Sequence, residues 1–489
     1  MPSQLSAIRA PVRLGRRSML GLPLVAGVAL ARAAAAQPES LEVLAARSVA
    51  DLERWTKAQG AELGARVIEL PNGRTLAESA ADRGLNPAST QKILTVAAAL
   101  DRLGPAYCFV TSLHGRQTGD TLDQLVLRGE GDPDFGSGDL LALVERLWER
   151  GVRRIQGDVL VDQSAFDNGW DPPAYEQRPN DSAAYRAPVS AVAVDGNTVT
   201  LHVQPTAAGA RALAWLEPAG IGRIDGAIVS TDKAKRPESV GLTITPSSGQ
   251  VLARVSGSVE SRRPMFQFAR RLPDPETAPA HVLVALLGRM GIRVAGRAAA
   301  GGAGVQAELA RHESRPLSQL VHALGKRSDN FYAEMLLKAL GRGPAKTGLG
   351  SSSSGAAAIE AFLKARSAFS PGMQIRNGSG LFDANRVSAA SLTRVLELAY
   401  ADTRIGPELT AALAIGGVDG TLASRFPKSA ADRRVRAKTG TLSSVIALSG
   451  YLFGPRPLAF AFLMNGLPGK QTEARRRIDG VLESLSAAR

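Results

Sequence analysis

Residues 86–103, NPASTQKILTVAAALDRL, decide how the rest of the sequence is interpreted. Pro87 suits the first turn of a helix, and the alanine- and leucine-rich run after it predicts a helix that Gly104-Pro105 ends. A spacing of three residues puts Ser89 and Lys92 on one helical face, close enough to touch. A lysine amine can activate a serine when desolvation or nearby cations lower its proton affinity. The helix start also offers free N–H groups and partial positive charge to an oxyanion. The stretch therefore predicts a serine nucleophile with a lysine base.

Two further short motifs supply groups that such a nucleophile needs. Ser328-Asp329-Asn330 precedes a predicted helix, and it offers a second hydroxyl and a carboxamide that can contact a peptide backbone. Lys438-Thr439-Gly440-Thr441 precedes a strand-like run. Its glycine lets another backbone approach closely, and its lysine and first threonine can hold a carboxylate. A second copy, Lys346-Thr347-Gly348, lies in a Gly/Ser-rich stretch without a strand pattern after it, so we reject that copy.

Other hydrolase and metal motifs are missing. The sequence contains no G-x-S-x-G, no H-E-x-x-H and no G-x-x-x-x-G-K-[ST]. Its 5 histidines are scattered, and its single cysteine, Cys108, allows no internal disulfide. We therefore expect no metal and no cofactor. A histidine-based triad stays open at this point, because only the fold brings triad members together.

The three motifs S-x-x-K, S-D-N and K-T-G occur together, in this order, in class A β-lactamases and penicillin-binding proteins. Ser328 follows Ser89 by 239 residues, and Lys438 follows Ser328 by 110 residues. So long a first gap resembles the class C low-molecular-mass penicillin-binding proteins, the D-alanyl-D-alanine carboxypeptidase/endopeptidase family. Three more stretches resemble that family's G-x-G-D-P, D-G-S-G-L and G-x-D-G-T-L: residues 129–133, 377–381 and 417–422. The resemblance covers essentially all of the chain after the first 36 residues.

The resemblance implies a serine DD-peptidase of bacterial peptidoglycan. Ser89 would attack the carbonyl between two D-alanines and form an acyl-enzyme, with Lys92 as its base. Ser328 would relay a proton to the leaving amine, and Asn330 would bind the substrate's amide. The carboxylate would be held by Lys438 and Thr439, beside Gly440, and the N–H groups of Ser89 and Thr441 would form the oxyanion hole. Expected partners are peptidoglycan stem peptides, their cross-links and β-lactam inhibitors.

Some matches bear on substrate preference. Asp181, in Asn180-Asp181-Ser182, resembles an aspartate of the family's insertion that contacts the substrate's diamino acid. The family's D-G-S-G-L-S-R begins here with Asn377 and ends with Asp383, where the family has an arginine that helps to recognise the peptide side chain. These two departures affect the expected diamino-acid contact and leave the acyl-transfer groups unchanged.

The expected fold class is α+β. The resemblance implies a penicillin-binding-protein/β-lactamase-like transpeptidase domain, a five-stranded antiparallel sheet with helices, that contains nested inserted domains. Strand-like runs near both ends of the chain, among them Val445–Leu452, also suggest one sheet built from both ends. Helices are expected at Ala356–Ala365, after a Gly/Ser-rich loop at 341–355, and at Ala389–Tyr400, with Ser388 as its N-cap. The expected divisions are an export signal at 1–36, a catalytic domain at 37–105 plus 310–489, an inserted domain at 106–190 plus 266–309, and an inner β-rich domain at 191–265.

The first 36 residues have the pattern of an export signal. Arg16-Arg17 precedes an apolar run from Met19 to Leu30, and a small-residue cleavage site follows at 33–37. The arginine pair is typical of the twin-arginine route. Because the apolar run is shorter than the roughly 20 residues of a bilayer span, we expect cleavage and a periplasmic or exported protein. The net charge of +14 suits anionic partners, but an exported protein rarely meets nucleic acid, so none is expected.

Alternatives remain at this stage. A β-lactamase or a D-aminopeptidase could be built on the same core, although the long first gap argues against a β-lactamase. A non-catalytic wall-binding relative could keep the fold. The sequence does not distinguish carboxypeptidase from endopeptidase action, and it does not indicate the oligomeric state.

Overall fold

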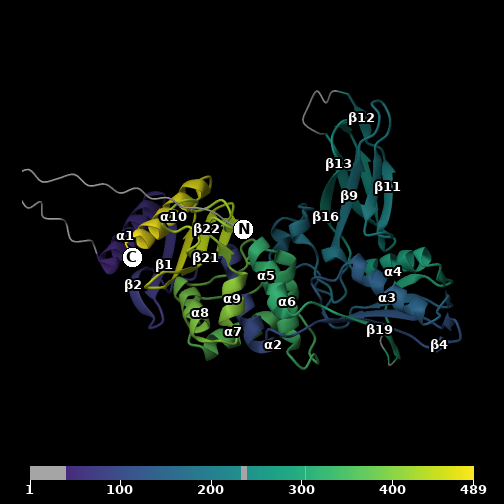
Figure 1. Ribbon diagram of the computed structural model, residues 1–489, viewed down its shortest axis with the longest axis horizontal. Coiled ribbons are helices and arrows are strands. Elements are labelled where there is room, and N and C mark those ends of the chain that lie inside the picture. Colours follow the sequence, from purple (N-terminus) through teal and green to yellow (C-terminus); the bar gives the residue numbers. More distant parts are fainter. Residues whose placement is uncertain (1–39, 233–238, 303, 305, 489) are drawn as a thin grey trace, which may run out of the picture. The chain divides into compact units, whose positions relative to one another are not determined.

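The computed structural model describes residues 40–232, 239–302, 304 and 306–488. The expected export signal at 1–36 lies outside these residues. The largest sheet (Figure 1) is antiparallel and has six strands, ordered β2 (Arg74–Ser79), β1 (Glu62–Glu69), β23 (Leu458–Asn465), β22 (Val445–Leu452), β21 (Val435–Leu442) and β20 (Ala414–Ile415). Five of these strands are long, and β20 has only two residues.

Both ends of the chain build this sheet. Strand β1 pairs with β23 over its whole length, with Ala65 opposite Phe462, and β22 joins β23 to β21. The eight residues of β22 are all buried, as are the first seven of β23, because helices cover both faces of the sheet. The expectation of one sheet made from both termini, and of an α+β fold, is therefore confirmed.

Two helical layers cover the sheet. On one face, α1 (Leu41–Ala58) and α10 (Gln471–Ala487) pack against alternate strand residues such as Phe460 and Phe462. The opposite alternation, including Ala459 and Ala461, packs against a larger helical layer. That layer contains α2 (Gln91–Leu103), α5 (Leu317–Arg327), α6 (Asn330–Arg342), α7 (Ser352–Ala365), α8 (Ala389–Ala401) and α9 (Gly406–Ala412).

Some sequence expectations about these helices need correction. The predicted helix after Pro87 starts as a 3₁₀ turn, Ala88–Thr90, and becomes α-helical only at Gln91. Helix α7 begins at Ser352, inside the Gly/Ser-rich stretch that contains the rejected motif copy, because the Ser351 hydroxyl caps it by accepting from Ser354 N. Helix α1 was not predicted from the sequence.

The chain between α2 and α5 forms further sheets. Strands β18 (Ala298–Ala300), β8 (Val159–Asp162), β6 (Leu125–Gly129), β3 (Val110–His114) and β19 (Glu308–Glu313) form one, and β17 (Arg293–Val294), β7 (Arg154–Ile155), β5 (Thr121–Leu122) and β4 (Gln117–Thr118) form another. Helices α3 (Ser137–Glu149) and α4 (Ala278–Arg289) pack on their shared core. The chain leaves along β3 and returns along β19, whose Glu313 pairs with Val110.

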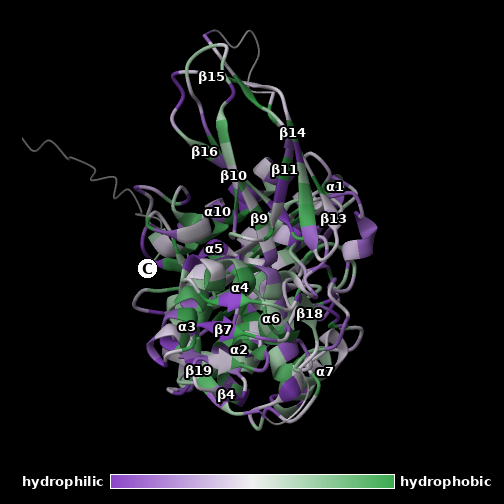
Figure 2. Ribbon diagram, turned by 90° about the vertical axis from the view of Figure 1, so that its right-hand side faces the viewer, coloured by the Kyte–Doolittle hydropathy of each residue, from purple (hydrophilic) through white to green (hydrophobic). Residues whose placement is uncertain are grey.

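A small β-module lies within this segment. Its three sheets contain β9 (Thr198–Gln204), β10 (Leu213–Glu217), β11 (Gly222–Gly226), β12 (Val229–Thr231), β13 (Gly241–Ser247), β14 (Gln250–Ser256), β15 (Ser258–Glu260) and β16 (Phe266–Arg271). Figure 2 shows both hydrophobic and hydrophilic residues along these strands, as expected for sheets with one covered face. The exact domain boundaries given above remain predictions.

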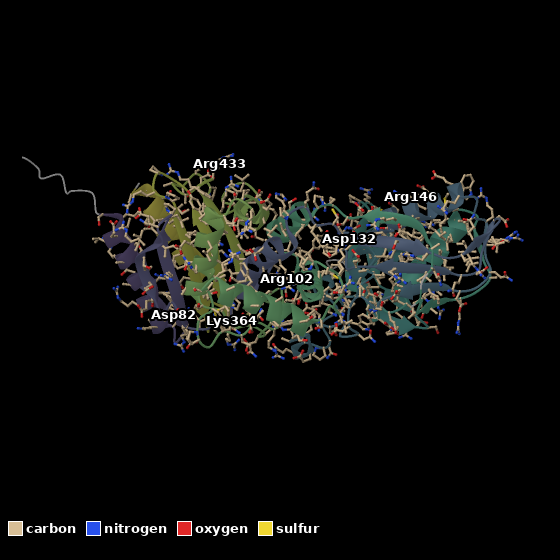
Figure 3. The ribbon with its side chains drawn as sticks, turned by 90° about the horizontal axis from the view of Figure 1, so that it is seen from below. Asp82, Arg102, Asp132, Arg146, Lys364 and Arg433 are labelled. Atoms are coloured by element: carbon tan, nitrogen blue, oxygen red, sulfur yellow. The ribbon has the colours of Figure 1, made fainter. Side chains whose placement is uncertain are left out.

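The surface carries many basic side chains. Arg102, Arg146, Lys364 and Arg433 are exposed (Figure 3), in agreement with the positive net charge. Within the described ranges, no helix combines the length and the apolar composition that a bilayer span requires.

Candidate active site

The S-x-x-K segment places its serine and lysine in contact. Lys92 Nζ lies 2.9 Å from Ser89 Oγ, 2.8 Å from Asn330 Oδ1 and 2.8 Å from the carbonyl oxygen of Ser379. A protonated lysine has three donors for these three oxygens. A neutral lysine keeps two donors, for the amide and carbonyl oxygens, and has a lone pair that can accept the Ser89 proton. The arrangement therefore suits a base that cycles between the two forms.

Burial makes the neutral form accessible. Lys92 is 1% exposed, and desolvation lowers its pKa from an ordinary 10.5 to about 7, against the opposing negative charges of Glu334 and Asp329. Lys438 is also buried, and its pKa falls well below the ordinary value because of desolvation and the nearby charge of Lys92. The charge of protonated Lys92 thus adds to burial in disfavouring protonation of Lys438.

The S-D-N segment joins two helices at the cleft. Ser328 ends α5 in the left-handed conformation, with φ of 60°, and Asp329 caps α6 by accepting from Tyr332 N at 3.1 Å. This junction aims Ser328 Oγ at Lys438 Nζ, which donates to it at 2.8 Å. It also aims Asn330 at both Lys92 and the carbonyl oxygen of Tyr185, to which the Asn330 Nδ2 donates at 3.2 Å.

Strand β21 packs directly on the turn that carries Ser89. A Cβ on Gly440 would lie 2.9 Å from the Pro87 oxygen and 3.0 Å from the Ala88 Cβ. On the other side, a Cβ on Gly380 would lie 1.8 Å from the Ala88 oxygen. Ala88 itself has φ of 44°. Two glycines therefore let strand and loop approach a strained turn from both sides, and this fixes where Ser89 points.

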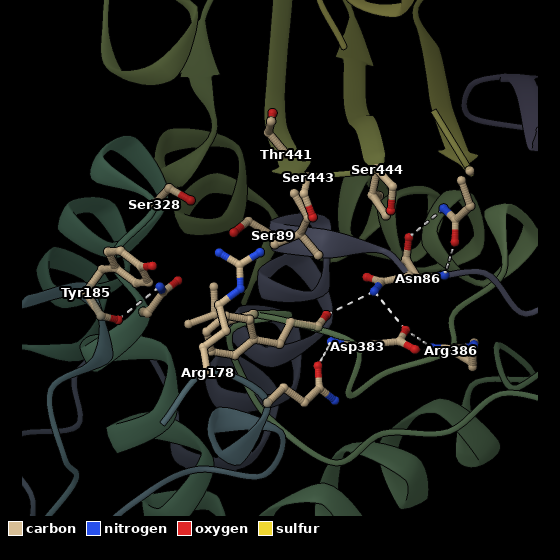
Figure 4. A pocket seen from close by; sticks show the side chains of 18 residues that line it. Asn86, Ser89, Arg178, Tyr185, Ser328, Asp383, Arg386, Thr441, Ser443 and Ser444 are labelled. Carbon is tan, nitrogen blue, oxygen red and sulfur yellow. Dashed lines mark hydrogen bonds and ion pairs between the residues drawn. The ribbon is translucent and has the colours of Figure 1, made fainter. Parts of the chain in front are cut away.

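Two cavities meet at the serine. A cavity of about 920 Å³ (Figure 4) is lined by Ser89 together with Ser328, Asn330, Tyr185, Arg178, Asp383, Arg386, Thr441, Ser443, Ser444 and others. A smaller cavity of about 330 Å³ is lined by Ser89, Ser328, Thr421, Ser424, Arg425, Thr439, Thr441 and Arg475. The three motifs therefore converge on one cleft with a wide arm and a narrow arm.

The residues expected to contact a diamino acid lie in different places. Asp383 lines the wide arm, but Arg386 Nη1 and Nη2 contact its two carboxylate oxygens at 2.6 and 3.0 Å. Arg178 also lines this arm, with its guanidinium over the ring of Phe382. Asp181 is not among the residues that line the arm; it accepts a hydrogen bond from Tyr185, which does. Its contact with a substrate stays a prediction.

The rejected motif copy lies elsewhere. Lys346 Nζ pairs with Glu130, a residue of the 129–133 stretch, and donates to the Cys108 oxygen at 3.4 Å. It stands over the ring of Tyr107, 4.9 Å from its centroid. None of these partners lines either arm of the cleft.

One buried acid beside the cleft, Glu334, was not predicted from the sequence. Glu334 is 1% exposed and accepts from Gly378 N at 3.0 Å and from Ser379 N at 2.8 Å. It thereby holds the loop whose Ser379 oxygen receives a hydrogen from Lys92. Burial raises the pKa of Glu334, although these N–H groups favour its charged form. Only its position four residues after Asn330, which places both on the same helical face, could have indicated from the sequence that Glu334 lies near the cleft.

Asn377 fits its buried position as an amide. Its Nδ2 donates to the oxygens of Pro173 and Leu381, both at 3.1 Å, and its Oδ1 accepts from Gly380 N at 2.9 Å. A carboxylate could not donate to the two carbonyls. The departure from the family's aspartate therefore keeps the loop shape with neutral hydrogen bonds.

Comparisons with known proteins agree with this geometry. The family model described as "D-Ala-D-Ala carboxypeptidase 3 (S13) family" matches residues 46–486. A D-alanyl-D-alanine carboxypeptidase of an Actinomadura species is 33% identical, over 84% of this chain and 79% of its own. The D-alanyl-D-alanine carboxypeptidase DacB of Haemophilus influenzae is 25% identical, over 90% of this chain and 92% of its own.

A solved structure shares the fold. The crystal structure of penicillin binding protein 4 (dacB) from Haemophilus influenzae covers 90% of this chain and 98% of its own, with a TM-score of 0.75 and 23% identity. The family model spans almost the whole described chain, and a relative above 30% identity agrees with it. The chain therefore belongs to the D-Ala-D-Ala carboxypeptidase 3 (S13) family of serine peptidases, as its three motifs indicated.

Proposed function

We propose that this enzyme hydrolyses the peptide bond after a D-alanine in peptidoglycan stem peptides, through an acyl-enzyme on Ser89. Both D-Ala-D-Ala termini, the carboxypeptidase substrate, and D-Ala-diamino-acid cross-links, the endopeptidase substrate, contain such a bond. The observation that carries the proposal is the contact of Lys92 Nζ with Ser89 Oγ in a buried site that lowers the lysine pKa to about 7.

The first step transfers the Ser89 proton to neutral Lys92 while Ser89 Oγ attacks the carbonyl carbon. The new ammonium keeps two acceptors, Asn330 Oδ1 and the Ser379 oxygen, so its charge forms where hydrogen bonds already exist. The backbone N–H groups of Ser89 and Thr441 are the proposed donors to the oxyanion. Both residues line the cleft.

The second step protonates the leaving amine. The proton that Lys92 took from Ser89 passes to this amine, and Ser328 Oγ, which lines the cleft and accepts a hydrogen bond from Lys438 Nζ at 2.8 Å, is the proposed relay. Lys92 is then neutral again. Collapse of the tetrahedral intermediate then breaks the carbon–nitrogen bond and releases the amine. Water attacks the acyl-enzyme, with Lys92 again as base, and regenerates Ser89.

The same chemistry predicts covalent capture of β-lactams. Incubation with penicillin followed by mass spectrometry of the digested protein should find the adduct on the peptide that contains Ser89. The adduct should be absent in Ser89→Ala and much slower to form in Lys92→Ala. Absence of any adduct in the wild-type protein would favour a non-catalytic wall-binding relative, and rapid penicillin turnover would favour a β-lactamase.

Export is part of the proposal. The pattern in the first 36 residues and the peptidoglycan substrate support a cleaved signal and a periplasmic or exported location. N-terminal sequencing of the protein from the cell envelope should find a start near residue 37. A start at Met1 would contradict cleavage.

A further inference from the structure

We propose that Arg475 binds the free carboxylate of the residue that leaves when the peptide bond is cut. The inference rests on the proposed function, and it names the substrate group that the narrow arm recognises. Arg475 lies on α10, and it lines that arm with Ser89, Thr439 and Thr441.

The lysine of K-T-G is poorly placed to be the main cation for this carboxylate. Lys438 is 2% exposed and is not among the residues that line the narrow arm. Its Nζ donates to Ser328 Oγ at 2.8 Å and to the Thr439 oxygen at 2.9 Å. Desolvation and the charge of Lys92 also lower its pKa well below the ordinary value, which weakens its positive charge. A carboxylate in the narrow arm needs another cation.

The arm contains two arginines, and one of them is already neutralised. Arg425 Nε lies 3.1 Å from both carboxylate oxygens of Asp479, and its Nη2 also donates to that carboxylate. The Arg425 side chain is only 10% exposed. Such a bidentate pair is rigid and leaves little net charge for a ligand.

Arg475 is the arginine of the narrow arm that forms no ion pair with a described residue. It precedes Asp479 by one helical turn, and its charge acts on the Asp479 carboxyl only through space, because hydrogen bonds from Arg425 occupy the Asp479 oxygens. Among the described residues, no carboxylate oxygen lies within 4 Å of the Arg475 guanidinium. The fork of N–H groups on an arginine matches a carboxylate in geometry as well as in charge.

Hydroxyl groups complete the subsite. Thr439 Oγ1 donates to Thr421 Oγ1 at 2.8 Å, and Ser424 lies in the same lining. The narrow arm, at about 330 Å³, suits a single leaving residue, while the arm of about 920 Å³ has room for the stem peptide on the acyl side. Ser89 lines both arms, so the scissile bond lies where they meet.

The wide arm offers a competing cation. Arg178 lines it, above the Phe382 ring, and among the described residues no ion pair joins Arg178 to a carboxylate. Arg178 lies on the side that we assign to the acyl peptide. A test must therefore compare Arg475 with Arg178.

The experiment uses two peptides that differ only at their C-terminus, an N-acylated D-Ala-D-Ala peptide and the same peptide as its C-terminal carboxamide. Arg475→Ala should raise KM for the acid about tenfold, since one charge-assisted contact is lost, with kcat changed by less than about threefold. Hydrolysis of the carboxamide should stay at the wild-type kcat/KM. Arg475→Lys should recover part of the affinity for the acid.

Matched controls separate local from general effects. Arg476→Ala removes an exposed arginine from the same helix and should leave both peptides unaffected. An equal loss on acid and carboxamide, no loss at all, or an acid-specific loss found in Arg178→Ala and not in Arg475→Ala would each overturn the inference. If the wild-type enzyme cleaves neither peptide, the proposed function itself fails, so the two failures are distinguishable.

Discussion

Lowering the pH should slow the acylation of Ser89 with the profile of a buried lysine. With the Lys92 pKa at about 7, the neutral fraction is about 90% at pH 8 and about 1% at pH 5. Only the neutral amine can accept the Ser89 proton. The acylation rate should therefore fall about a hundredfold between these pH values and reach a plateau above pH 8.

The surroundings of Lys92 explain why its pKa is lowered. Desolvation disfavours the ammonium and lowers the pKa of Lys92. Glu334 and Asp329 act in the opposite direction. A solvated lysine would instead be about 0.4% neutral at pH 8, and its rate would still be rising at pH 10.

The assay is the rate of covalent labelling by a fluorescent penicillin, followed by stopped flow from pH 5 to pH 10 under single-turnover conditions. Lys92→Arg keeps a positive charge that does not dissociate in this range, so labelling should be about 10²–10⁴-fold slower and should lose the pH dependence. A labelling rate that does not change between pH 5 and pH 9, or a Lys92→Arg variant that keeps the wild-type pH dependence, would refute Lys92 as the base.

Three other substitutions test the surroundings of the site. Gly380→Ala should slow acylation at least tenfold and destabilise the fold, because its Cβ would lie 1.8 Å from the Ala88 oxygen. The control Gly372→Ala changes a glycine with a similar φ of 80° but with open space around it, so it should affect only stability. Equal acylation rates in the two variants would contradict the packing argument. Glu334→Ala leaves two buried backbone N–H groups without an acceptor and should cost about 2–5 kcal/mol in urea unfolding, whereas a cost under about 0.5 kcal/mol would show that Glu334 does not hold the loop. Lys346→Ala should leave penicillin labelling within about twofold of wild type, and a loss of labelling would restore the rejected motif copy to the site.

The sequence predicted a helix or strand well where neighbouring residues alone determine it. The buried run of β22 was expected at its observed bounds, Val445–Leu452, because apolar residues continue through both faces of a covered strand. Helix α8 begins after Ser388, as expected, since the serine side chain accepts from Ser391 N. Helix α1 was not predicted. The start of α7 was predicted four residues too late, at Ala356 instead of Ser352, because its serine-rich first turn resembles a loop in composition.

The motifs identified the family, but not how the site works. The chemical identities of Ser89, Lys92 and Asn330 are properties of the sequence. The strained turn at Ala88 cannot be predicted from the sequence, because it depends on Gly380 and Gly440, which approach it from segments that lie far away in the chain.

The sequence by itself determined the order of the three motifs, the family and the sheet shared by both ends of the chain. Only the tertiary structure decided that Lys92 is buried enough for a pKa of about 7, that Lys438 faces Ser328 while Arg475 faces the narrow arm, and that Asp383 is paired with Arg386. The physical reason is that helix and strand signals act over a few neighbouring residues. Desolvation and charge act through space, between groups that only the packed fold brings together.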